Sequence, residues 1–185
     1  MDRYPVDEQM DEIELVLPCK GMEAAALEYK KEHFDNNEWE IHGSTLLDQT
    51  DSYDDWLEQI KKDSDIRTVN YNWVVTTTLF AVRKSDGRIV GMVAIRHTLN
   101  DFLRRYGGHI GFGVRPSERN KKYATQMLKL ALVYCKGLGL ERVMLACYRD
   151  NDASRKTITA CGGILEEESI HDDGKVVQKY WITIN

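Results

Sequence analysis

Two neighbouring segments, from Val69 to Lys84 and from Arg88 to His97, are rich in hydrophobic and β-branched residues. This pattern predicts a pair of strands. Ser85-Asp86-Gly87 separates them and is typical of a hairpin turn. Shorter apolar runs predict further strands at 13–17, 107–115, 143–147, 164–171 and 176–184. The run from 143 to 147 is apolar throughout, which indicates a strand covered on both faces.

Apolar residues at helical spacing predict four helices between these strands. They are expected from Gly21 to His33, after Asp51-Ser52, from Tyr123 to Leu138, and from Asn151-Asp152 to Gly162-Gly163. A helical turn is expected within 98–106. The order is strand, two helices, three strands, helix, strand, helix, two strands. This order predicts an α/β protein with a mixed central sheet flanked by helices, and the length of 185 residues favours one domain over 1–185.

The chain is organised around the stretch from Gly107 to Leu128. Its strand should stop at Arg115-Pro116, because proline cannot donate to a sheet ladder. A polar, basic segment follows before the helix begins, with cations at Arg119, Lys121 and Lys122. A strand, a turn and a helix start aim backbone N–H groups and a helix dipole at an anion, and the cations favour a phosphate. The alternative interpretation of the cations is a solvated helix face.

The distribution of charge is uneven although the net charge is only −5. Residues 1–66 carry 6 Lys/Arg against 19 Asp/Glu, and the remainder carries 19 against 11. The basic part suits an anionic cofactor, and the acidic part could attract a cationic substrate. Solubility alone is the alternative explanation of this asymmetry.

Several classes of protein are disfavoured by composition. No apolar run approaches the roughly 20 residues that span a bilayer, and the acidic N-terminus lacks an apolar signal core. The four cysteines form neither a CxxC pair nor a zinc spacing, so we expect no metal and a cytoplasmic location. Cys135 and Cys147 lie in apolar runs and are expected to be buried thiols. Nucleic-acid binding is disfavoured because the overall charge is negative and aromatic residues hardly interleave with the basic ones.

The segment Arg119-Asn120-Lys121-Lys122-Tyr123-Ala124 resembles the acetyl-CoA loop of the GNAT superfamily of N-acetyltransferases, whose signature there is Arg/Gln-x-x-Gly-x-Gly/Ala. Arg119 and Ala124 match, whereas Lys122 stands where the family has glycine. The element order also resembles the GNAT fold over essentially the whole chain. The motifs at 96–100, 107–110, 150–154 and 180–182 are similar to a bacterial branch of predicted acetyltransferases.

The resemblance implies acetyl-CoA as co-substrate and direct transfer of the acetyl group. It places Phe112, Gly113 and Val114 along the pantetheine arm, with the N–H of Val114 as a candidate oxyanion donor. The pyrophosphate would lie on the N–H groups of the segment that follows, formed by Arg119, Asn120, Lys121, Lys122, Tyr123, Ala124 and Thr125. Asn151 and Ser154 match positions that contact the cofactor, and helix capping is the equal alternative.

The proton donors and acceptors are less certain from the sequence. Ile158 stands where the family often has the tyrosine that protonates the leaving thiolate, and Tyr123, Tyr148 and Tyr180 are possible substitutes.

His109 is the candidate base, because no carboxylate lies between 107 and 117. Alternation places it on one face with Gly111 and Gly113, which would leave room for a ligand, although a lone strand histidine is more often structural. Arg96, His97 and Asn100 either shape the acceptor pocket or fix the following loop.

Together these features predict an acyl-CoA-dependent N-acetyltransferase. Its acceptor would be a small-molecule or peptide amine, which the acidic first third suggests is cationic, and the protein would be a monomer or homodimer. The alternative is a non-catalytic CoA-binding sensor or pseudoenzyme of the same fold, because both the glycine and the tyrosine of the family are replaced.

Overall fold

The computed structural model describes residues 11–184. Its elements are β1 (Ile13–Val16), α1 (Glu23–Asp35), α2 (Tyr53–Asp63), β2 (Thr76–Arg83), β3 (Ile89–Arg96), β4 (Ile110–Val114), α3 (Tyr123–Gly137), β5 (Arg142–Tyr148), α4 (Asp152–Ala160), β6 (Ile164–Ile170) and β7 (Val176–Thr183). Single turns lie at η1 (Lys20–Met22), η2 (Leu47–Gln49), η3 (Leu103–Gly107, a π turn) and η4 (Pro116–Glu118). The order of strands and helices is the one that the sequence pattern predicts.

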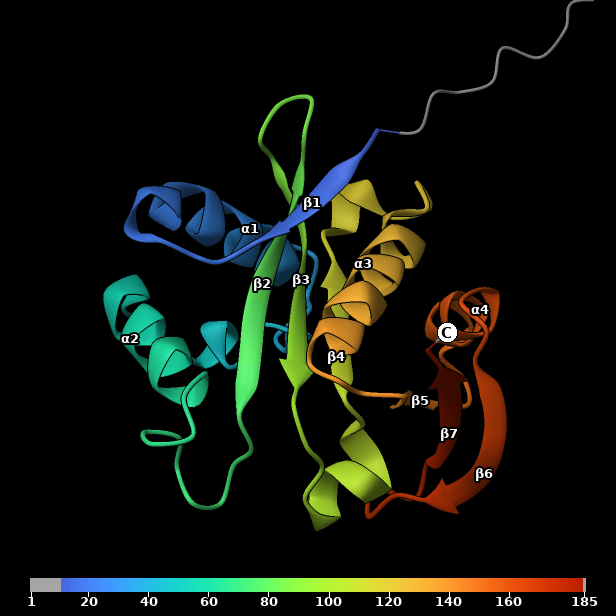
Figure 1. Ribbon diagram of the computed structural model, residues 1–185. Helices are drawn as coiled ribbons and strands as arrows, with labels where there is room; N and C mark the ends of the chain where they lie inside the picture. The colour runs from blue at the N-terminus through green and yellow to red at the C-terminus, as the bar shows by residue number, and fades with distance from the viewer. Residues whose placement is uncertain (1–10, 185) are drawn as a thin grey trace, which may run out of the picture.

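The strands form two sheets, which stand apart in Figure 1. One has the order β1-β2-β3-β4 and the other β5-β7-β6, and every pairing within them is antiparallel. The central sheet flanked by helices that the sequence predicts is present, and it is divided between β4 and β5. Among the described residues these two strands meet at a single bridge, Gly108 with Leu145. Gly108 has φ 68° and a Cβ there would lie 2.5 Å from the Met144 carbonyl oxygen, so this crossing requires glycine.

Helices cover both faces of the first sheet. Leu79 and Ala81 of β2 join a core with α3 and with residues of the second sheet, whereas Phe80 and Val82 join a core with α1 and α2. This alternation follows the two-residue period of a strand. In Figure 1, α3 crosses in front of the strands, and α1 and α2 lie to the left. The end of β4 is thereby held between α3 and the segment that follows α1.

The start of β2 differs from the prediction. The strand begins at Thr76, not at Val69, because the preceding residues form turns. The Val69 N–H donates to the Asp65 carbonyl at 2.9 Å, and the Trp73 N–H donates to the Asn70 carbonyl at 2.8 Å. The apolar residues of this segment therefore line a surface cavity of about 670 Å³ beside His97 instead of pairing in a sheet.

Candidate functional site

The end of β4 presents an unpaired edge to the gap between the two sheets. The Arg115 N–H donates to the Val90 carbonyl of β3 at 2.8 Å, and Gly113 lies opposite Met92. Backbone polar groups alternate in direction along an antiparallel strand, so the odd-numbered residues of β4 face β3. The N–H and C=O groups of Phe112 and Val114 therefore face the gap. Those of Gly113, which was expected to lie along a bound ligand in the same way, face β3.

The glycines of β4 do not leave an empty space, contrary to the expectation. A Cβ on Gly113 would lie 2.6 Å from the His42 carbonyl oxygen, and one on Gly111 would lie 3.4 Å from Arg96 Nη2. The loop around His42 and the guanidinium of Arg96 fill this face of the strand. Gly113 is needed for the close approach of the His42 carbonyl, whereas a Cβ on Gly111 would make an ordinary contact with Arg96. A ligand has access to β4 at its edge instead.

The turn between β4 and α3 offers a series of free N–H groups. Within the described structure, no backbone N–H from Asn120 to Thr125 donates to another residue. Asn120 and Lys122 both have φ 63°, in the left-handed region. Successive N–H groups in such a turn, followed by a helix start, form a concave site for an anion. This geometry fits the phosphate site expected from the sequence except at Arg119, whose N–H donates to the Pro116 carbonyl at 3.4 Å.

The left-handed backbone of Lys122 explains why the GNAT motif has glycine at this position. A left-handed residue with a Cβ costs roughly 1–2 kcal/mol, which glycine avoids. Lys122 accepts this conformation at the N-cap of α3 with its side chain exposed to solvent.

The other two cations of the turn are held by carboxylates. Both terminal nitrogens of Arg119 donate to Glu38, each at 2.6 Å, and Lys121 Nζ donates to Glu118 at 2.8 Å. Hydrogen bonds from Arg119 are the main reason why the pKa of Glu38 falls to about 2. The side chains of Arg119 and Lys121 thus already have carboxylate partners within the protein.

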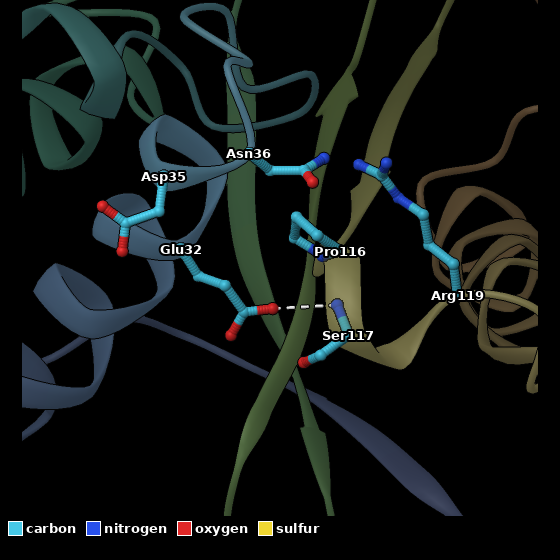
Figure 2. Close-up of a pocket in the computed structure, with 6 residues that line it drawn as sticks. All are labelled: Glu32, Asp35, Asn36, Pro116, Ser117 and Arg119. Carbon is cyan, nitrogen blue, oxygen red and sulfur yellow. Dashed lines mark hydrogen bonds between the residues drawn. The ribbon is translucent and has the colours of Figure 1, made fainter.

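An open cavity of about 500 Å³ lies where α1 meets this turn (Figure 2). Its lining residues are Glu32, Asp35, Asn36, Pro116, Ser117 and Arg119. The Ser117 N–H donates to Glu32 Oε1 at 2.8 Å across it, and the side chains of Asn36 and Arg119 point toward one another. The end of α1 is therefore joined to the turn by polar contacts from both sides.

His109 lies just before β4 and links the two sheets. Its N–H donates to the Met144 carbonyl at 2.7 Å, and its Nδ1 accepts the Met144 N–H at 2.9 Å. Because Nδ1 is an acceptor, the ring proton lies on Nε2. Burial, and next the positive charge of Arg104, lower the pKa of His109. The imidazole can accept a proton at Nδ1 only by giving up its bond to β5, so its role as the base stays a prediction that this contact disfavours.

Carboxylates gather around Tyr148, the last residue of β5. Its hydroxyl donates to Asp173 of the β6–β7 turn at 3.1 Å. The pKa of Tyr148 is raised by burial first and then by Asp173, with smaller effects from the charges of Glu40 and Asp150. Glu40 precedes His42, the residue that packs on Gly113, so this acidic group of residues extends toward the end of β4. We call Glu40, Tyr148, Asp150 and Asp173 the acidic mouth.

The acetyltransferase (GNAT) family matches residues 45–162, which is more than half of the chain. The chain belongs to the GNAT family.

Solved structures of acetyltransferases share the fold. The microcin C7 self-immunity acetyltransferase MccE, in complex with acetyl-CoA and AMP, has 22% identity and a TM-score of 0.64 over 94% of this chain and 93% of that one. The spermidine/spermine N-acetyltransferase SpeG from Vibrio cholerae has 16% identity and a TM-score of 0.62, covering 92% and 93%. The ribosomal-protein-S5-alanine acetyltransferase from Vibrio fischeri has 15% identity and a TM-score of 0.64, covering 97% and 96%. A comparison with curated proteins gave no match.

As a GNAT protein, the chain is an acetyltransferase with acetyl-CoA as co-substrate. The geometry fits this substrate at two places. The free N–H groups from Asn120 to Thr125 suit the pyrophosphate, and the edge of β4 at Phe112 and Val114 suits the amides of the pantetheine arm.

Two further positions of the GNAT pattern have structural roles here. Asn151 caps α4, since its Oδ1 accepts the Ser154 N–H at 3.0 Å, which confirms the capping interpretation. Contact of Asn151 and Ser154 with the cofactor stays a prediction. Ile158 is fully buried in the core between the sheets, so an apolar residue fills the place of the usual tyrosine.

The three candidate tyrosines have different surroundings. The Tyr123 hydroxyl is 3.3 Å from Arg83 Nη1, and the Tyr180 hydroxyl donates to Gln178 at 2.7 Å. Tyr148 alone of these three belongs to the acidic mouth.

The polar residues after β3 fix the following turn, one of the two alternatives left open by the sequence. Arg96 Nη1 donates to the carbonyls of Gly107 and Gly108 at 3.2 and 3.1 Å, and Asn100 Oδ1 accepts the Leu103 N–H at 2.9 Å. His97 Nε2 is 2.9 Å from Thr77 Oγ1.

Other residues of the site were missed in the sequence. Glu38, Glu40 and Asp173 lie in turns without a motif, and only their negative charge pointed to them.

Residues 11–184 contain no helix long and apolar enough to cross a membrane. Over the same residues, no group of three or more His, Cys, Asp or Glu could hold a metal ion.

Proposed function

We propose that this enzyme transfers the acetyl group of acetyl-CoA directly to a cationic amine, carried by a small molecule or a peptide. The acidic mouth is the observation that carries this proposal. Asp173 accepts a hydrogen bond from the Tyr148 hydroxyl, the charges of Glu40 and Asp150 also raise the pKa of that hydroxyl, and Lys175 Nζ lies 5.0 Å from the centre of the ring. Carboxylates and an electron-rich ring face both attract an ammonium group.

The proposed reaction uses mainly backbone groups. The amine nitrogen attacks the thioester carbonyl carbon, a C–N bond forms, and the C–S bond breaks. The N–H of Val114, directed toward the gap, would stabilise the oxygen as it becomes negative. The departing thiolate has a pKa near 8.5 and can take its proton from water or from Tyr148. The ammonium proton leaves to solvent through the mouth, or to His109 if that imidazole gives up its bond.

Two structural neighbours support an amine acceptor in general terms. One is named for spermidine and spermine and another for the alanine of a ribosomal protein. Both kinds of acceptor present an amine that is protonated near neutral pH. At the identities observed they support the class of acceptor and do not select one compound.

We also propose that the enzyme is cytoplasmic and acts as a monomer or a homodimer. All four cysteines are free thiols, which is usual in a reducing compartment.

The test is acetylation of a panel of cationic, neutral and acidic amines, followed by release of the CoA thiol. We expect turnover with cationic amines and a rate that falls as salt increases, because exposed charges are screened. Glu40→Gln together with Asp173→Asn should raise the KM for the acceptor by about three- to tenfold, the effect of weakened contacts to exposed charges.

Asp54→Asn is the matched control, since this carboxylate pairs with Lys20 on the exposed surface of α2. It should leave the acceptor KM unchanged. Turnover restricted to neutral or acidic amines, or an unchanged KM in the double variant, would contradict the proposed acceptor class.

A further inference from the structure

The turn after α1 carries a carboxylate with four polar contacts. Glu38 accepts two hydrogen bonds from Arg119, at 2.6 Å each, and one from Asn36 Nδ2 at 2.7 Å. His33 Nδ1 lies 2.8 Å from the same carboxylate, and the Glu38 N–H donates to the His33 carbonyl at 2.9 Å. Side chain and main chain therefore both fix Glu38 in place. Paired, charge-assisted hydrogen bonds of this kind hold a guanidinium in one orientation.

The guanidinium held by Glu38 also contacts β4. Arg119 Nε donates to the Val114 carbonyl at 3.2 Å, on the side of the strand that faces the gap. Each nitrogen of this guanidinium thus makes one contact with Glu38 or Val114. Two N–H groups of the terminal nitrogens remain, so a phosphate bound through the Arg119 side chain would have to share the guanidinium with Glu38 and Val114.

The peptide unit before Val114 is fixed from the opposite side. The buried Tyr29 hydroxyl of α1 lies 3.4 Å from the Gly113 carbonyl oxygen, and the His42 carbonyl packs against the Gly113 Cα. In a trans peptide the C=O of Gly113 and the N–H of Val114 point in opposite directions. Fixing this carbonyl therefore directs the Val114 N–H toward the gap.

We propose that Glu38 is a positioning residue for acetyl transfer, which holds Arg119 on the Val114 carbonyl and so orients the neighbouring N–H that stabilises the oxyanion. The inference rests on the proposed function, because that function assigns the oxyanion to Val114. It also gives the Arg119 side chain a role different from the phosphate contact implied by the GNAT motif. Phosphate then depends on the free N–H groups of the turn and on Lys122.

The two roles of Arg119 predict opposite effects of Glu38→Gln. A neutral amide weakens the grip on Arg119 while keeping the size of the side chain. If Arg119 positions the strand, kcat falls about ten- to a hundredfold at saturating substrates and the Kd of acetyl-CoA stays within about threefold, because small displacements of catalytic groups are costly. If Arg119 is a phosphate ligand restrained by Glu38, the freed guanidinium strengthens binding and kcat is unchanged.

Arg119→Lys is the second variant, because lysine keeps the charge and loses the fork that reaches Glu38 and Val114 together. It should reproduce the loss of kcat with a Kd that changes less than threefold. Glu58→Gln is the matched control: Glu58 pairs with Lys62 on the exposed face of α2 and should change neither value.

Binding of acetyl-CoA is measured by calorimetry and kcat by thiol release, with the melting temperature of each variant recorded. An unchanged kcat in folded Glu38→Gln, or a tenfold weaker Kd with unchanged kcat in Arg119→Lys, overturns the positioning role. If the unmodified protein transfers no acetyl group, the proposed function fails first. The contact is then tested by hydrogen exchange of the Arg119 Nε–H, which donates to the Val114 carbonyl; this exchange should be faster in Glu38→Gln and unchanged in Glu58→Gln.

Discussion

His109 illustrates how one contact changes the interpretation of a residue. Its type and its place before the central strand made it the best candidate base in the sequence. Its partner, the backbone N–H of Met144, lies 35 positions away in the chain and could not be inferred from any local pattern. A buried imidazole that accepts a main-chain N–H is more useful as a link between two sheets than as a proton acceptor.

His109→Asn separates these two roles, because the side-chain oxygen of asparagine can take the place of Nδ1 as acceptor and cannot act as a base. We expect His109→Asn to keep kcat within about threefold. His109→Ala should lose roughly 1–3 kcal/mol of unfolding free energy, because the Met144 N–H is left without a partner. Steady-state kinetics and urea unfolding provide both measurements. A folded His109→Asn variant with kcat reduced 10²–10⁴-fold would instead establish the imidazole as the base.

Whole elements were more predictable than their contacts. The unit of β4, turn and α3 was predicted because proline, a basic turn and an apolar helical face follow one another directly in the sequence. Tyr123, Met127 and Leu128 are buried as that pattern requires. The apolar pattern alone does not show the division of the sheet, since it depends on how β4 and β5 diverge after Gly108. Glu38 was missed because its partner Arg119 is 81 residues away.

The start of α3 carries a prediction about Lys122. Lys122→Gly should keep the Kd of acetyl-CoA within about tenfold, because the N–H groups of the turn remain. The free energy of unfolding of this variant should be unchanged or higher by up to about 1 kcal/mol, since glycine relieves the left-handed strain. Lys122→Ala removes the charge and retains the strain. Equal loss of binding in both variants, measured by calorimetry, would assign recognition to the ammonium group instead.

The molecule as a whole uses much of its charge asymmetry internally. Acidic residues of the first third pair with basic residues of later segments: Arg115 is 3.3 Å from Glu28 and 3.1 Å from Glu32, and Arg119 binds Glu38. This explains part of the uneven charge that the sequence analysis assigned to a cationic substrate. The carboxylates of the acidic mouth are what remains to support that assignment.

These contacts predict that the free energy of unfolding decreases as the pH falls. The pKa of Glu38 is about 2 in the folded protein and 4.5 for a free glutamate, so its contribution is complete above pH 4.5 and is lost as the pH falls toward 2. Burial also lowers the pKa of the neighbouring His33, which acts in the same direction below pH 6.5. We expect Glu38→Gln to unfold about 1–2 kcal/mol more easily at pH 7, allowing for solvent screening, and the difference to vanish near pH 2. Urea unfolding at several pH values measures it; a difference independent of pH would contradict the ion pair.

The exposed edge of β4 also makes the stability of the protein depend on the concentration of acetyl-CoA. We expect the co-substrate to lie along this unpaired edge, so that its binding adds contacts to β4 that the unloaded enzyme lacks. Above the dissociation constant, each tenfold increase in free acetyl-CoA adds about 1.4 kcal/mol to the free energy of unfolding. A protease that attacks transiently opened chains would then spare the enzyme when acetyl groups are plentiful and remove it during starvation.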